Sequence, residues 1–316
     1  MARDVSFEIG DTLLQRGGVI KDDVVKGRLY GPKSAPLIVV MGGISADRFV
    51  ADDPIRQKGW WSPLVRKGGA IDINRFQVLG YDFAPANERD DLPNVITTED
   101  QAMRLKKLLD GLGINAAALI GSSYGGMVAL AFAKDYPDQV ANLCIIGAAH
   151  RPYPIGVAWR GIQRRMVRVA MKAGVPKEGL KLARELAMTT YRTPVEFDDR
   201  FDLEETSSDP SRFDICDYLG SRGDDFAERM DAERFLLLSE SIDLHRVSPE
   251  EISTPALLMS AISDQLAPLP DMRELRDRLA GPSELFTFTS LFGHDAFLKE
   301  FDMMAPKLEE FCGGLK

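Results

Sequence analysis

The sequence predicts an α/β protein in which a mostly parallel central sheet is interrupted by a helical insertion. From residue 24 to residue 147, short β-rich apolar runs alternate with helical segments. From about 151 to 248 the strand signal fades into helical segments rich in Arg, Met and Leu, and strand-like runs return after residue 249. Such alternation is typical of parallel strands joined by helical crossovers. We therefore expect a core formed by residues 1–150 and 249–316 and a helical cap formed by residues 151–248.

Seven strands are expected in the core. They are residues 24–30, 37–41, 76–81, 117–120, 143–146, 256–262 and 285–289. A helix is predicted between the third and the fourth strand, because Thr98-Glu99-Asp100-Gln101 fits a capping box and apolar residues then recur at helical spacing up to residue 112. Further helices are predicted at about 271–279 and 296–311. A core, a cap and then completion of the core is the organisation of an α/β-hydrolase fold.

Composition excludes several classes of protein. The 39 basic and 48 acidic side chains give a net charge of −9, which argues against a nucleic-acid or membrane partner. The N-terminus leads into no signal-peptide core, and no run approaches the ~18 apolar residues of a spanning helix. Cys144, Cys216 and Cys312 are far apart and have no metal-ligand spacing. We expect a cytoplasmic protein with ordinary thiols and no metal site.

The motif Gly-x-Ser-x-Gly at residues 121–125 lies between a predicted strand and an apolar helix. A serine on a sharp strand-to-helix turn needs neighbours without side chains, since Cβ atoms at Gly121 and Gly125 would clash as the turn closes. Ser123 is therefore the candidate nucleophile; a plain Gly-rich turn is the alternative.

A serine nucleophile needs a base and an acid, which in this fold follow it in the order acid, base. His294 lies in a loop after the last predicted strand, and Asp264 follows the strand before it, so they are the candidate base and acid. The other two histidines, His150 and His245, are interpreted as structural or cap-lining residues. One oxyanion donor would be the N–H of Tyr124, and the other that of Ile44 or Gly43 in the glycine-containing loop after residue 41.

Four basic residues of the cap recur every four positions, and a helix would place them on one face. They are Arg160, Arg164, Arg168 and Lys172. Such a face is either solvated or a docking surface for an anionic cosubstrate.

In several of its motifs the chain resembles the homoserine O-acyltransferase family, whose members transfer acetyl or succinyl groups in methionine biosynthesis. The resemblance lies in residues 121–127, in the cap segment 182–193, in Tyr218-Leu219 with Gly223 and Phe226, and in residues 293–298. It covers nearly the whole chain. Three features depart from the family: the cap is shorter than in many members, the loop at 42–46 lacks the form His-Ala-Leu-Thr-Gly, and Tyr124 stands where methionine is frequent.

The resemblance implies roles for two further residues. Arg192 matches the arginine taken to hold the homoserine carboxylate, a role that a planar guanidinium suits. Asp295 is similar to the aspartate that meets the substrate amine. Without the motif, Arg192 would be interpreted as pairing with Glu196 or Asp198 on the cap surface.

The predicted activity is transfer of an acetyl or succinyl group from acyl-CoA to the hydroxyl of L-homoserine, by a ping-pong mechanism. Acetyl-CoA is slightly preferred as donor, no cofactor is held permanently, and Arg160, Arg164 and Arg168 are the candidate CoA contacts. The resemblance also implies a homodimer. The alternatives are an esterase or thioesterase, a transferase that acylates another hydroxyl such as that of serine, and a binding module with a vestigial triad.

Overall fold

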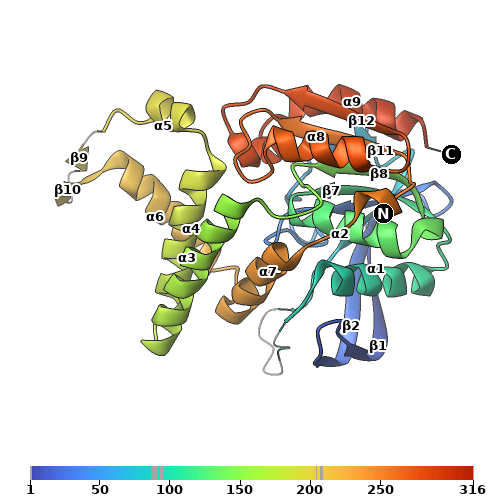
Figure 1. Ribbon diagram of the computed structural model, residues 1–316, viewed down its shortest axis with the longest axis horizontal. Helices are drawn as coiled ribbons and strands as arrows, with labels where there is room; N and C mark the ends of the chain where they lie inside the picture. The colour runs from blue at the N-terminus through green and yellow to red at the C-terminus, as the bar shows by residue number, and fades with distance from the viewer. Residues whose placement is uncertain (1, 87–91, 93–94, 204, 207–208, 316) are drawn as a thin grey trace.

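The computed structural model describes residues 2–86, 92, 95–203, 205–206 and 209–315 (Figure 1). Its main sheet has eight strands, in the order β1-β2-β6-β3-β7-β8-β11-β12. Their bounds are β1 (Arg3–Leu13), β2 (Val19–Tyr30), β3 (Leu37–Met41), β6 (Gln77–Tyr81), β7 (Ala117–Ser122), β8 (Val140–Ile146), β11 (Ala256–Ala261) and β12 (Ser283–Phe288). In this spatial order, the six strands that begin with β6 and end with β12 are parallel to one another. Strands β1 and β2 are antiparallel to their neighbours. The predicted α/β class is confirmed.

Each of the seven predicted strands overlaps an observed one, but β1 was not expected. It pairs along its length with β2 at the edge of the sheet, and most of its side chains are exposed. An edge strand with so few buried positions lacks the run of apolar residues by which a buried parallel strand is recognised.

Helices cover both faces of the sheet (Figure 1). Helices α1 (Thr98–Leu112), α2 (Tyr124–Asp135) and α8 (Leu269–Arg278) pack on one face, where Leu108, Val128 and Met272 join a single core cluster. Helix α9 (Phe301–Gly313) packs on the other face, through Met304 and Leu308. The two faces are filled by alternate residues of the same strands, as the period of a β-strand requires.

Two predicted helix boundaries were wrong. The capping box of α1 is made by Thr97 with Asp100, so that Thr98 is the first helical residue rather than the cap. The helix expected at 296–311 is two elements, the 3-10 turn η3 (Gly293–Leu298) and α9. The N–H groups of Lys299 and Glu300 both bond back to the carbonyl of Ala296, which closes the first element before α9 begins.

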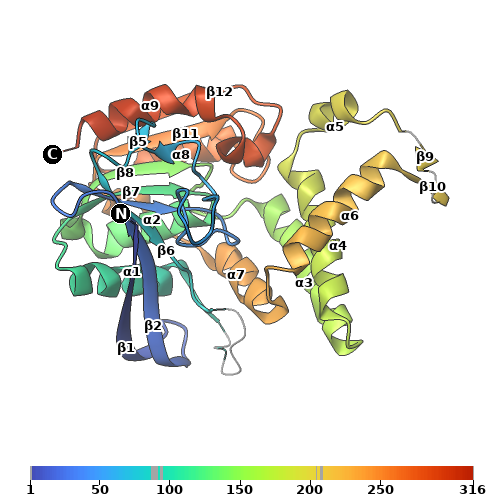
Figure 2. The same cartoon turned by 180° about the vertical axis from the view of Figure 1, so that it is seen from behind.

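The inserted segment is helical, as expected. It comprises α3 (Pro154–Lys172), α4 (Pro176–Tyr191), α5 (Pro194–Arg200), α6 (Asp214–Ala227) and α7 (Ala232–Leu244), with two short strands, β9 (Glu205–Thr206) and β10 (Asp209–Phe213). Figures 1 and 2 both place α3 to α6 to one side of the sheet, with α7 between them and the core. Helix α7 contributes Leu238 to the core cluster and Phe235 to a separate cap cluster around Val167 and Phe226. It therefore joins the two parts, and the division at residues 150 and 249 stays a prediction.

Remaining short elements are β4 (Val65–Arg66), β5 (Ile71–Asp72), η1 (Pro137–Gln139) and η2 (Pro249–Glu251). The acidic stretch around 198–214 lies partly outside the described residues. Among the helices that the structure describes, none combines the length and the apolar character needed to cross a bilayer.

Candidate active site

Ser123 lies on a tight turn between β7 and α2. Its backbone has φ +52° and ψ −121°, a left-handed conformation that L-residues seldom adopt. A Cβ at Gly121 would lie 2.4 Å from the carbonyl oxygen of Gly125, and a Cβ at Gly125 would lie 2.5 Å from the backbone of Met41. No real Cβ tolerates such distances, so the turn can close only with glycine at both positions.

Ser123, His294 and Asp264 are brought together from three separate strand ends. The Oγ of Ser123 lies 2.9 Å from Nε2 of His294, and Nδ1 of His294 lies 2.8 Å from Oδ2 of Asp264. The other carboxylate oxygen, Oδ1, accepts the N–H groups of Leu266 and Ala267 at 2.8 and 3.0 Å. These bonds fix the orientation of the carboxylate, so its second oxygen faces the imidazole.

Burial and neighbouring charges shift the pKa of His294 in opposite directions. Burial alone would lower the pKa of the imidazole, but the charge and hydrogen bond of Asp264, together with the charge of Asp295, raise it above the ordinary value of 6.5. The nearby cation of Arg160 lowers it. A histidine that lies between a carboxylate and a serine hydroxyl can exchange a proton with that hydroxyl.

His150 and His245 lie elsewhere and have structural partners. Nδ1 of His245 lies 2.8 Å from the hydroxyl of Thr98, and burial lowers its pKa to about 3. Nε2 of His150 lies 3.3 Å from Glu274 and 3.2 Å from Arg278. Neither lines the cavity at Ser123.

The candidate oxyanion loop is joined directly to the serine turn, because the N–H of Gly125 donates to the carbonyl of Gly42 at 2.8 Å. Within the described part of the chain, no hydrogen-bond acceptor is placed against the N–H of Ile44 or of Tyr124. The side chain of Tyr124 points away from this site: it is buried, and its hydroxyl lies 2.8 Å from that of Ser241 on α7. Two donors therefore stay available beside Ser123.

A cavity of about 290 Å³ opens at Ser123 between the core and the cap. The core contributes residues 43–46, His294 and Asp295, and the cap contributes Arg160, Arg184, Tyr191 and Phe226. Arg184 lies over the rings of Tyr191 and Phe226, at 5.4 and 5.5 Å from their centroids. The site thus combines an apolar wall with several cations, an environment suited to a small ligand that carries a negative charge.

Arg192 and Asp295 form a buried ion pair. The Nε of Arg192 donates to Asp295 at 3.0 Å, and its Nη1 contacts Glu196 at 3.4 Å. Asp295 lines the cavity at Ser123, whereas Arg192 is not among its lining residues. Pairing of Arg192 with Glu196 was the alternative expectation. The pair is present, but it lies in the interior rather than on the cap surface, and Arg192 also binds Asp295.

The predicted basic face of α3 is not one surface. Arg160 and Arg164 both bind Asp243 of α7, each at 2.6 Å, and their side chains are largely buried. Of the three predicted CoA contacts, only Arg168 is exposed. Sequence reasoning missed Asp243, since its two partners are some eighty positions away and no local pattern connects them.

The three cysteines are free: Cys144 and Cys312 are buried and Cys216 is exposed. Among the described residues no group of His, Cys, Asp and Glu is arranged to hold a metal ion.

The fold and the serine, histidine and aspartate at its strand ends define a protein of the α/β-hydrolase class. Residues 58–301 match the model of the α/β-hydrolase fold family. The chain is 40% identical to the homoserine O-succinyltransferase of Xanthomonas campestris pv. campestris over 87% of its length and 74% of the relative's. It is 31% identical to the homoserine O-acetyltransferase of Carboxydothermus hydrogenoformans, covering 87% and 84%. Within the class, the chain belongs to the homoserine O-acyltransferase family.

A solved structure agrees with this placement. The homoserine O-acetyltransferase of Staphylococcus aureus superimposes on the chain with a TM-score of 0.85 and 26% identity, covering all of this chain and 96% of that one. The fold is therefore shared over the cap as well as the core.

Proposed function

We propose that the protein transfers an acetyl or succinyl group from acyl-CoA to the side-chain hydroxyl of L-homoserine. The observation that carries this proposal is the hydrogen-bonded series Ser123, His294, Asp264, which opens into a cavity walled by the cap. Membership of the acyltransferase family supports acyl transfer over other serine chemistry.

In the first half-reaction, His294 takes the proton of Ser123 as Oγ attacks the thioester carbonyl. The carbonyl oxygen becomes an oxyanion, to which the N–H groups of Ile44 and Tyr124 donate. The intermediate collapses with cleavage of the C–S bond, and the imidazolium of His294 returns the proton to the departing thiolate. Asp264 keeps the imidazole in place and stabilises its positive charge.

In the second half-reaction, homoserine occupies the position that the thiol has left. His294 takes the proton of its hydroxyl, the oxygen attacks the acyl-enzyme, and the ester Oγ of Ser123 leaves with that proton. The product is the O-acyl amino acid. Water would give hydrolysis instead, so the cap helices that wall the cavity contribute by limiting access of water.

Asp295 and Arg192 would bind the two charged ends of the acceptor. Asp295 lines the cavity next to His294, which supports a role in meeting the amine. Arg192 reaches the site through Asp295, and its contact with the substrate carboxylate requires the buried pair to rearrange as homoserine enters. We propose this rearrangement as part of acceptor binding.

The test is thiol release from acetyl-CoA and from succinyl-CoA, each with homoserine, with serine and with no acceptor. Acceptor-dependent release with formation of the O-acyl amino acid is expected, whereas equally fast release without an amino acid would establish a thioesterase. The preference for acetyl-CoA stays a prediction. Succinyl-CoA is the alternative donor, because a succinyl group carries a free carboxylate that an arginine could bind. The cavity is lined by three arginines, Arg160, Arg184 and Arg229.

A further inference from the structure

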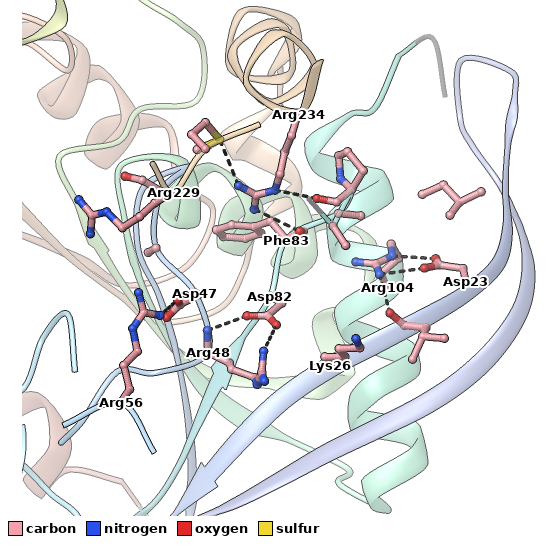
Figure 3. Close-up of a pocket in the computed structure, with 18 of the residues that line it drawn as sticks. Asp23, Lys26, Asp47, Arg48, Arg56, Asp82, Phe83, Arg104, Arg229 and Arg234 are labelled. Carbon is pink, nitrogen blue, oxygen red and sulfur yellow. Dashed lines mark hydrogen bonds and ion pairs between the residues drawn. The ribbon is translucent and has the colours of Figure 1, made fainter. Parts of the chain in front are cut away.

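A second cavity, of about 450 Å³, adjoins the one at Ser123 (Figure 3). It lies between β2, the loops that follow β3 and β6, and the segment that joins α6 to α7. The two cavities have Ser45, Ala46, Phe226 and Arg229 in common. A long ligand could therefore lie across these four residues, with one end at Ser123 and the other in the second cavity.

The wall of the second cavity is basic, although the chain as a whole is acidic. Among the described residues that line it, six carry a positive charge and three a negative one: Lys26, Arg48, Arg56, Arg104, Arg229 and Arg234 against Asp23, Asp47 and Asp82. Figure 3 shows three of these cations held by the three carboxylates. Arg104 binds Asp23 through two nitrogens, Arg48 binds Asp82 at 2.6 Å, and Arg56 binds Asp47. Arg234 and Lys26 form no ion pair with any of these three carboxylates.

Arg234 has no carboxylate partner within the described residues. Its guanidinium donates to the carbonyls of Pro85 at 2.7 Å and of Phe83 and Ile44 at 3.4 Å (Figure 3 shows the cluster). Arginine stays protonated in proteins, so this largely buried group brings a full positive charge to the wall. Burying an unpaired charge is unfavourable, and an anion in the cavity would offset that cost.

Lys26 adds a second cation. It is exposed on β2, and no ion pair with it is formed by any described residue. Beside these charges the wall has apolar side chains, namely Ile20, Val24, Phe83, Phe226 and Met230. Cations next to an apolar surface suit a ligand that carries both phosphates and a flat base.

We propose that the second cavity binds the phosphate-bearing nucleotide end of the acyl thioester, with Arg234 and Lys26 as contacts for phosphate oxygens. The thioester arm would pass over Ser45 and Ala46 to bring the acyl carbon to Ser123. This inference rests on the proposed function, and it moves the expected CoA site from the face of α3 to the second cavity.

The variant Lys26→Glu tests the proposal without touching the catalytic residues. Its matched control is Arg168→Glu, the same change of charge sign on the exposed part of α3. Binding of adenosine 3′,5′-bisphosphate to the full-length protein is measured by calorimetry, with inorganic phosphate as competitor. We expect Lys26→Glu to weaken the nucleotide about tenfold, as loss of one charge-assisted contact does, and Arg168→Glu to leave it unchanged.

A kinetic arm separates the nucleotide from the rest of the donor. Lys26→Glu should raise KM for acyl-CoA and leave KM for the corresponding acyl-pantetheine, which has no nucleotide, at the wild-type value. Arg234→Met should act in the same direction, but it also removes the bonds to the carbonyls of Pro85, Phe83 and Ile44, so Lys26 is the decisive position.

The inference would be overturned by wild-type protein that binds no nucleotide, by equal affinity in Lys26→Glu and wild type, or by weakening in Arg168→Glu alone. Inorganic phosphate that binds as tightly as the nucleotide would show a site for free anions and not for the donor. If Lys26→Glu weakens nucleotide binding but the wild-type protein acylates no amino acid, the inferred nucleotide site is supported and the proposed function is rejected.

Discussion

The two sides of the cavity at Ser123 are held in place by different kinds of interaction. On the core side the reactive turn is fixed by the backbone: Ser123 N–H donates to Ile146 at 2.9 Å, and Gly125 N–H donates to Gly42 at 2.8 Å. On the cap side the geometry depends on side chains, above all on Asp243, which binds Arg160 and Arg164. Backbone bonds survive most substitutions, whereas a carboxylate shared by two cations is lost with one mutation. We therefore expect the chemistry to depend on a few core residues and the selectivity to depend on the cap.

The largest effect should come from Ser123→Ala. Removal of the nucleophile should lower the rate of thiol release by about 10⁵-fold, because acylation then has no attacking oxygen. The rate with acyl-CoA and homoserine measures it. Ser122→Ala is the matched control: the neighbouring Ser122 hydroxyl is buried and has no hydrogen-bond partner among the described residues, so its loss should leave the rate near that of wild type. A fully active Ser123→Ala protein would reject the whole triad.

Asp264→Asn should have the next largest effect, a loss of about 10⁴-fold in kcat. The amide oxygen can still accept the N–H groups of Leu266 and Ala267, so the loop keeps its shape, but the charge that stabilises the imidazolium is gone. Thermal unfolding should therefore change little while activity falls. A large fall in melting temperature with proportionate loss of activity would assign Asp264 a structural role only.

On the cap side, Asp243→Ala should lower the free energy of unfolding by about 2–4 kcal/mol, since it leaves two largely buried arginines without a counter-charge. Urea unfolding measures it. Lys177→Ala is the control, because it breaks only the exposed pair with Glu228 and should change nothing measurable. Equal stability of both variants would show that these ion pairs do not hold α3 against α7.

The smallest effect is a shift in pH dependence. The base acts when neutral, so kcat/KM should fall as pH drops through the pKa of His294, with a midpoint above 6.5. Asp295→Asn removes a charge that raises this pKa, and the midpoint should move to lower pH. Arg160→Gln removes a cation that lowers it, and the midpoint should move to higher pH. Shifts in the same direction would contradict this assignment of charges.

Parts of the fold that depend on local sequence were predictable. The buried parallel strands were found because they are short, apolar and bounded by turns, and their order placed Ser123, Asp264 and His294 at strand ends. The first strand escaped notice because its stability comes from pairing with β2 rather than from its own pattern. The helix boundary at Thr97 and the break before α9 were misplaced, since hydrogen bonds of single residues decide them.

By itself, the sequence determined the class of the fold, the glycine frame around Ser123 and the three residues that meet there. These follow from periodicity, from the steric demands of a strand-to-helix turn and from the order of strands along the chain. Only the tertiary structure decided which charges are neutralised: Asp243 holds the predicted basic face, Asp295 shares Arg192 with Glu196, and Arg234 has no carboxylate partner among the described residues. The physical reason is that an ion pair acts over a few ångströms between residues far apart in the sequence. Its partners are therefore fixed by how the cap helices pack on one another and on the core.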